Sequence, residues 1–130
     1  MSTDKRGIDK GKMSLTLDTA EVYDRLSIVE VKTSYAKKFE TKRDLSEQIL
    51  YLMNALSNFL GYDFSRTIYL SQEYKDLYEI NRQLFDYIDK SKKDGFPASE
   101  IDKLNHKRYL AKKEIQEKYF GKLEEIKLGY

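Results

Sequence analysis

The apolar residues of the segment 45–59 recur at spacings of three and four, and this period constrains the fold more than any other feature of the chain. Such spacing places apolar side chains on one face of an α-helix, whereas a β-strand would show alternation instead. Gly61 follows the run directly, where a helix commonly ends. The pattern predicts an amphipathic helix that starts near residues 42–44 and carries Leu45, Ile49, Leu52, Leu56 and Phe59 on one face.

Three further segments have the helical period, over residues 20–39, over residues 71–92 and from about Ser99 onward. Asp18 and Thr19 precede the first of them and offer N-cap oxygens. The apolar stripes are Val22, Leu26, Val29 and Thr33 in the first segment, Tyr74, Leu77, Leu84 and Ile88 in the second, and Ile101, Leu104, Ala111, Ile115 and Tyr119 in the third.

The other segments precede or connect these helices. Residues 62–71 are expected to be a connector that contains at most a helical turn. Residues 13–17 alternate apolar and polar residues, as in a short strand or an extended lead-in. Ile28 and Val31 lie outside the main apolar stripe of their helix, so more than one face of that helix should be buried.

The fold class that follows is all-α, a helical bundle of about four helices whose last two form an antiparallel hairpin. A chain of 130 residues suits one domain, which we place at residues 14–130 after a basic tail, residues 1–13, that should be disordered. The formal charge of +2 is located in this tail, and Lys and Glu are interleaved along the helices. Nucleic-acid binding is disfavoured because it usually needs a basic stripe that acidic residues do not balance.

The chain contains no Cys and one His, His106, which excludes a disulfide framework and leaves little for a zinc site. It has no Gly-rich phosphate loop, no GxSxG and no HExxH motif, so we expect no cofactor. His106 has no Ser, Cys or Asp partner at a fixed spacing and is interpreted as a surface side chain. No apolar run approaches the roughly 20 residues that span a membrane, and no secretory signal is recognisable, which predicts a cytoplasmic protein.

Asn81 occupies the position in its helix where the next apolar residue should fall. In an antiparallel hairpin, the numbers of facing residues have a nearly constant sum, so pairing Ile88 with Ile101 places Asn81 opposite Arg108. The apolar stripes of both helices are therefore interrupted in the same layer.

Two interpretations of this polar layer compete. In the structural one, the polar residues fix the register of the helices, and a carboxylate such as Glu30 or Asp86 neutralises Arg108. In the functional one, the guanidinium, flanked by Asn105 and Lys112, is kept for a carboxylate or phosphate from outside. The structural solution is the commoner, because an unpaired Arg between helices would cost several kcal/mol whenever the ligand was absent.

Several segments resemble a family of small bacterial and phage proteins of unknown function, whose genes tend to appear among glycosyltransferase genes. LTLDTAEVYDRLSIVEVK, residues 15–32, is similar to its opening pattern evS.GE..DKltILeIK. LYEINRQLFDYID resembles its Asn-containing helix, LNHKRYLAKKEI its vNd.Ra.lK..IN segment, and the terminal EEIKLGY its EEKsY ending, although Phe85 stands near a usual Trp. The resemblance implies a fold class without an established activity, and its recurring polar positions correspond to Asp24, Arg25, Glu30, Lys32, Asn81, Asn105, Arg108, Lys112, Glu124, Glu125 and Lys127.

The leading functional hypothesis is a non-catalytic binding protein that takes up a small anionic molecule, such as a nucleotide or a sugar phosphate, in an inter-helix cleft. A phage protein that sequesters a signalling nucleotide is one form of it. The alternative is a helical protein–protein interaction module or homodimer whose polar layer is purely structural. An enzyme ranks third, because nothing in the chain identifies a nucleophile. The candidate ligand-binding residues are Arg25, Glu30, Lys32, Asn81, Asn105, Arg108 and Lys112.

Overall fold

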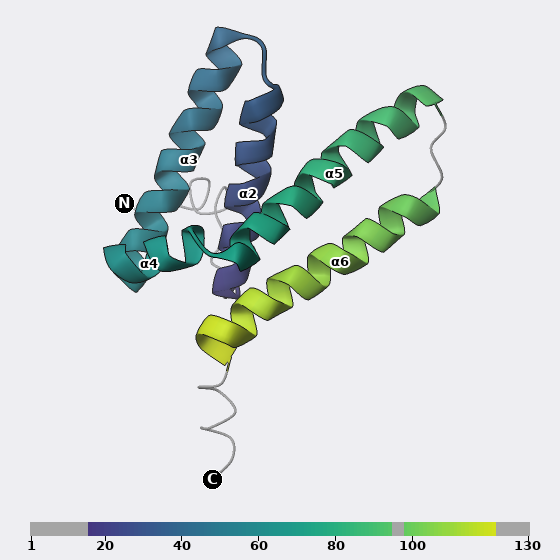
Figure 1. The fold of residues 1–130 in the computed structure, drawn as a ribbon. Coiled ribbons are helices and arrows are strands. Elements are labelled where there is room, and N and C mark those ends of the chain that lie inside the picture. The colour runs from purple at the N-terminus through teal and green to yellow at the C-terminus, as the bar shows by residue number, and fades with distance from the viewer. Residues whose placement is uncertain (1–15, 95–97, 122–130) are drawn as a thin grey trace, which may run out of the picture.

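The computed structural model of the chain describes residues 16–94 and 98–121, and within these ranges the protein is all-helical, as the sequence predicts. No strand occurs in the described part of the chain, and residues 16–18 precede the first helix without regular structure. The rest of the segment 13–17 and the basic tail lie outside the described residues. The elements, labelled as in Figure 1, are α2 (Thr19–Tyr35), α3 (Phe39–Leu60), α4 (Tyr62–Tyr69), α5 (Gln72–Asp94), α6 (Ala98–Gln116) and a π-helical turn, η1 (Glu117–Gly121).

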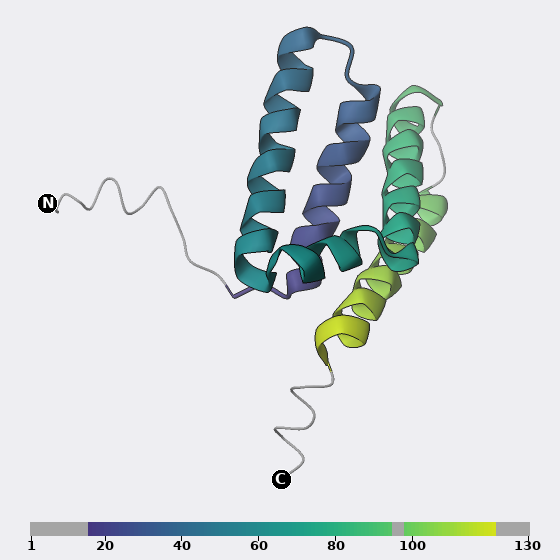
Figure 2. The same cartoon turned by 60° about the vertical axis from the view of Figure 1, so that its left-hand side comes forward.

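Helix α2 is the centre of the arrangement, because α3, α5 and α6 all pack against it. In Figure 2, α3 lies on one side of α2 and the α5 and α6 helices lie on the other. In both views, α5 and α6 lie next to one another. Burial on two sides explains why Val31 is as well buried as Leu26 and confirms that more than one face of this helix is covered.

The amphipathic pattern of residues 45–59 correctly predicts α3, with one exception at its end. Leu56 is buried, and Ile49 and Leu52 pack against the core. Phe59, however, is 77% exposed, so its predicted place in the buried face is wrong. The next residue, Leu60, packs against the core instead, because the chain turns at Gly61 and brings α4 against that side of α3.

The segment predicted as a connector, residues 62–71, is mostly a helix of eight residues, α4. Its Ile68 is fully buried in the core, and the Tyr23 hydroxyl donates to the Ser65 carbonyl oxygen across 2.9 Å. The described part of the chain therefore holds five α-helices rather than about four. The expectation failed because α4 is too short to show a clear period in the sequence.

Two predicted helix boundaries also need correction. Helix α2 ends at Tyr35 rather than near Phe39, and α3 begins at Phe39, before the predicted start at residues 42–44. Asp18 is the N-cap residue of α2, but its side chain makes no capping hydrogen bond. Its backbone carbonyl oxygen instead accepts the N–H of Glu21 at 2.9 Å.

The junction between α3 and α4 depends on Gly61, whose backbone has φ of +89° and ψ of +149°. Only glycine adopts this region readily, so a side chain here is strained even though a Cβ would meet no atom within 4 Å. We expect Gly61→Ala to destabilise the fold by about 1–3 kcal/mol. Thermal unfolding followed by circular dichroism checks this, and an unchanged melting temperature would contradict it.

Candidate functional site

The polar layer predicted from Asn81 and Arg108 is built around a residue of α2, Asp24, which is only 3% exposed. The guanidinium of Arg108, on α6, donates to both of its carboxylate oxygens, from Nε to Oδ1 at 3.0 Å and from Nη2 to Oδ2 at 2.5 Å. This bidentate pairing matches the planar fork of arginine to the carboxylate. A buried negative charge is thereby neutralised by a neighbouring helix.

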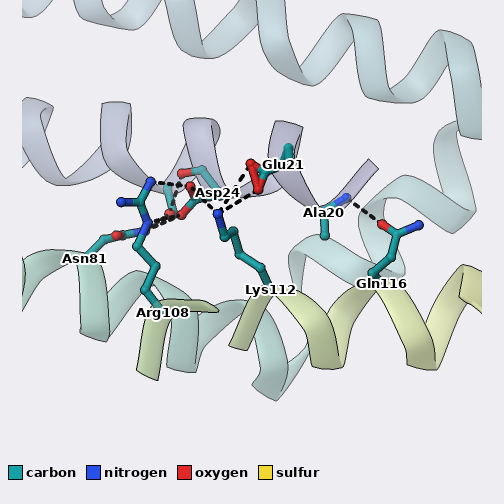
Figure 3. Close-up of polar contacts among 8 residues, drawn as sticks. Ala20, Glu21, Asp24, Asn81, Arg108, Lys112 and Gln116 are labelled. Atoms are coloured by element: carbon teal, nitrogen blue, oxygen red, sulfur yellow. Dashed lines mark hydrogen bonds and ion pairs between the residues drawn. The ribbon is translucent and has the colours of Figure 1, made fainter. Parts of the chain in front are cut away.

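Asn81, on α5, completes the coordination of the same carboxylate. Its Nδ2 donates to Asp24 Oδ1 at 2.9 Å and to Ser27 Oγ at 2.7 Å, and its side chain is buried. Ser27 in turn donates to the backbone carbonyl oxygen of Asp24 at 2.8 Å. Figure 3 shows Asn81 and Arg108 converging on Asp24. An amide interrupts the apolar stripe of α5 because it satisfies a buried carboxylate and a buried hydroxyl at once.

The layer continues along α2 and α6 toward the end of the bundle. Lys112 Nζ lies 2.6 Å from Glu21 Oε1 and 3.9 Å from Asp24 Oδ2. Gln116 Oε1 accepts the backbone N–H of Ala20 at 3.0 Å, one of the N–H groups that the start of a helix leaves without an intrahelical partner. Two carboxylates therefore face two cations along one seam (Figure 3), and the layer carries no net charge.

Neither carboxylate that the sequence suggested as the partner of Arg108 fills that role. Glu30 accepts hydrogen bonds from the hydroxyls of Tyr69 and Tyr74. Asp86 accepts from the Tyr35 hydroxyl at 2.7 Å and pairs with a different arginine. Glu30 cannot reach Arg108 because it is six residues beyond Asp24 and so points about 120° away from it around the same helix.

The structure brings together only part of the predicted set of ligand-binding residues. Asn81, Arg108 and Lys112 share the polar layer, whereas Arg25, Lys32 and Asn105 are exposed. Arg25 follows Asp24 directly and is turned about 100° from it. Glu30 lies apart from the layer and accepts hydrogen bonds from two tyrosines. The predicted residues Glu124, Glu125 and Lys127 lie outside the described residues.

The helical spacing did not identify Asp24 as the centre of the layer. This residue was indicated only by the family resemblance. A signal was present, because Glu21, Asp24 and Ser27 recur every third residue and form a polar stripe on a helix that otherwise buries apolar side chains. Which helices would face this stripe could not be deduced from its spacing alone.

The electrostatics of the layer are those of a closed network. The hydrogen bonds that Arg108 donates to Asp24 raise the pKa of the guanidinium, which is charged in any case. His106 is exposed and its ring stacks near Tyr109, as expected for a surface side chain. No cluster of His, Cys, Asp and Glu among the described residues could hold a metal ion. The layer offers no free nucleophile or base, so its contacts support the structural interpretation.

No helix within the described ranges is long and apolar enough to cross a membrane. No protein-family model, curated protein or solved structure matches this chain. The resemblance to the bacterial and phage family stays a prediction.

We expect Arg108→Met to destabilise the fold by about 3 kcal/mol, because it removes the bidentate partner of the buried Asp24 carboxylate and leaves only Lys112, at 3.9 Å, while changing helix propensity little. The matched control is Arg82→Met, whose ion pairs with Glu79 and Asp86 are partly exposed and should contribute at most about 1 kcal/mol. Urea unfolding of both variants provides the measurement. Equal losses would contradict a central role for the Asp24 contacts.

The tyrosines packed around α2 should make the fold sensitive to alkali. Burial, followed by the hydrogen bond to Glu30, raises the pKa of Tyr69 to about 12 and also raises the pKa of Tyr74. In the unfolded chain these phenols ionise near 10, so their contribution is present below pH 10 and is lost as the pH rises to 12. Absorbance titration with circular dichroism should show late phenol ionisation coinciding with unfolding. Ionisation of every tyrosine near pH 10 in a folded protein would refute this.

Proposed function

We propose that this protein is a helical protein–protein interaction module that forms a homodimer through α3. The observation that carries the proposal is the poor burial of this helix, since Leu56 is the one fully buried residue among its 22. On its outer side, Tyr51 is 74% exposed and Phe59 is 77% exposed. Large aromatic side chains in such positions are typical of contact surfaces, where they provide area with little loss of side-chain entropy.

The charge distribution favours a second copy as the partner. More than a third of all residues in the chain are charged, yet residues 48–62 contain no Asp, Glu, Lys or Arg. In a two-fold symmetric dimer the same patch is present on both sides, so any charge near the axis faces its own copy. An uncharged segment avoids that repulsion, and it forms the second half of α3 and the start of α4.

A specific register follows from the helical spacing. Tyr51, Ala55 and Phe59 lie one turn apart in a row, with the small Ala55 between two rings. In an antiparallel pair of α3 helices centred on Ala55, Tyr51 of each copy faces Phe59 of the other. The gap above each alanine then lets the two helices approach closely at the crossing point, as ridges-into-grooves packing requires. In this proposal α5 and α6 form the antiparallel hairpin that the sequence predicts and stay clear of the interface.

Uptake of a nucleotide or sugar phosphate by the polar layer has less support. Arg108 and Lys112 are paired with Asp24 and Glu21, so an entering anion would have to displace a buried carboxylate. The other predicted cations, Arg25 and Lys32, are exposed and stand apart from the layer. The homodimer is therefore the better account of the observed contacts.

We expect the wild-type chain to sediment as a dimer and Phe59→Lys to sediment as a monomer at the same concentration, because each introduced ammonium group would be buried against Tyr51 of the other copy without an opposite charge. The matched control is Leu110→Lys, which places the same charge at an exposed leucine of α6 and should leave the dimer intact. Analytical ultracentrifugation distinguishes these outcomes. A wild-type monomer at high concentration would refute the proposal.

The register is tested by Ala55→Cys. The chain has no cysteine, so any disulfide that forms must join the two introduced thiols. Helices crossing at this position bring the two Cα atoms near the roughly 4.4–6.8 Å that a disulfide needs, and mild oxidation should give a covalent dimer. Lys113→Cys, at an exposed position of α6, should stay monomeric on a denaturing gel. Equal cross-linking of the two variants would rule out this register.

A further inference from the structure

A second polar feature lies on the side of α2 away from Asp24, in an open groove of about 560 Å³ between α2, the inner side of α3 at Ile49, the end of α4 and α5. Its lining contains one carboxylate, Glu30, one ammonium group, Lys75, and three tyrosines, Tyr69, Tyr74 and Tyr78, and we call it the Glu30 groove. Its volume lies within the range of pockets that bind small molecules. None of these groups takes part in the proposed dimer contact.

The carboxylate of Glu30 is held in place without being neutralised. One oxygen accepts the Tyr69 hydroxyl at 2.5 Å and the other accepts the Tyr74 hydroxyl. Among the described residues it makes no ion pair, and Lys75, which lines the same groove, does not approach it within salt-bridge distance. A carboxylate has about four acceptor sites, so two remain after the tyrosines are bound. An uncompensated negative charge at a partly buried position attracts a cation.

The rings around Glu30 are suited to the same kind of ligand. The Tyr69 and Tyr74 rings pack against one another beside Glu30, with their centroids 5.0 Å apart and their planes tilted by 40°. Tyr78 lines the groove beside them. The faces of aromatic rings carry partial negative charge and attract ammonium groups within about 6 Å. Arg66 already lies over the Tyr69 ring, with its guanidinium carbon 5.8 Å from the centroid.

We propose that the Glu30 groove is a binding site for a small organic ammonium ion, with the carboxylate opposing its charge and the tyrosines that line the groove contacting its alkyl groups. The combination distinguishes this ligand class from others. An anion would face Glu30, and a neutral apolar molecule would leave its charge uncompensated. A methylated or alkylated ammonium ion satisfies both the carboxylate and the rings.

The test is a titration of the full chain with choline, followed by tyrosine ring resonances in NMR spectra. We expect saturable binding with a dissociation constant of roughly 1 mM, typical of a small, partly exposed ligand. The alcohol 3,3-dimethyl-1-butanol, in which a carbon atom replaces the charged nitrogen of choline, should bind at least about tenfold more weakly. No saturable shift with choline, or equal binding of the isostere, would overturn the proposal.

Variants assign the site. Glu30→Gln should weaken choline binding about tenfold or more, because it removes the charge and keeps a hydrogen-bond acceptor. Glu40→Gln, an exposed acid in the first turn of α3, removes the same charge elsewhere and should bind choline like the wild type. If Glu30→Gln fails to fold, Tyr78→Leu is the variant that tests the site, and it should also weaken choline binding. It should fold, since the Tyr78 hydroxyl makes no hydrogen bond in the described part of the chain. If whichever of Glu30→Gln and Tyr78→Leu folds binds choline as tightly as the wild type, the proposal is overturned.

The same head group occurs on modified lysine side chains, and the source is distinguished by titrating an acetylated, amidated trimethyllysine in parallel. Binding of choline alone assigns a small free quaternary ammonium compound as the ligand. Binding of both compounds assigns recognition to the ammonium head itself, and binding of neither overturns the proposal.

Discussion

The fold depends on the burial of one carboxylate in its central helix. Asp24 is enclosed by α2, α5 and α6, and an ionised group in that position is tolerated only when donors from its neighbours reach it. Arg108 and Asn81 supply those donors from two different helices, so the register of α5 and α6 against α2 is set by the same contacts that neutralise the charge. A shift of either helix by one turn would leave the buried Asp24 carboxylate without one of its hydrogen-bond donors. Hydrogen bonds of fixed length and direction constrain this register more tightly than apolar contacts do, because apolar contacts are non-directional.

The closure of this network also decides where function can lie. Every cation of the layer already faces a carboxylate of α2, and the hydroxyl of Ser27 is used as both donor and acceptor. Because these buried polar groups already have hydrogen-bond or ion-pair partners, few of them are available to bind a ligand. The groups with unused capacity are on the outside of the bundle, where rings on α3 face solvent and the carboxylate of Glu30 makes no ion pair with residues 16–94 or 98–121. The functional proposals therefore rest on surfaces rather than on the buried layer.

The sequence predicts the all-helical fold from spacing within single helices, and it predicts the layer shared by Asn81 and Arg108 from the pairing of two helices that are neighbours along the chain. Leu56, Leu77 and Leu104 fall on buried faces as the period requires. The acceptor of the layer was not predictable in the same way, since Asp24 is 57 residues from Asn81 and 84 from Arg108, and its place depends on how α2 docks. The exposure of Phe59 was missed for a related reason, because it follows from the turn of the chain at Gly61, whereas α4 was missed because it is too short to show a clear period.

The unequal packing of the helices links the core to the proposed interface. The Asp24 network ties α2 to α5 and α6, whereas α3 is held chiefly by apolar contacts with α2 and α4. A partner that covers the outer side of α3 would add burial where the monomer has least, and the hydrophobic contribution scales with the area removed from water. It would leave the polar layer on the opposite side of α2 undisturbed. Association through α3 therefore requires no rearrangement of the network that fixes the fold, and any stability it adds should appear mainly in α3 and the helices it touches.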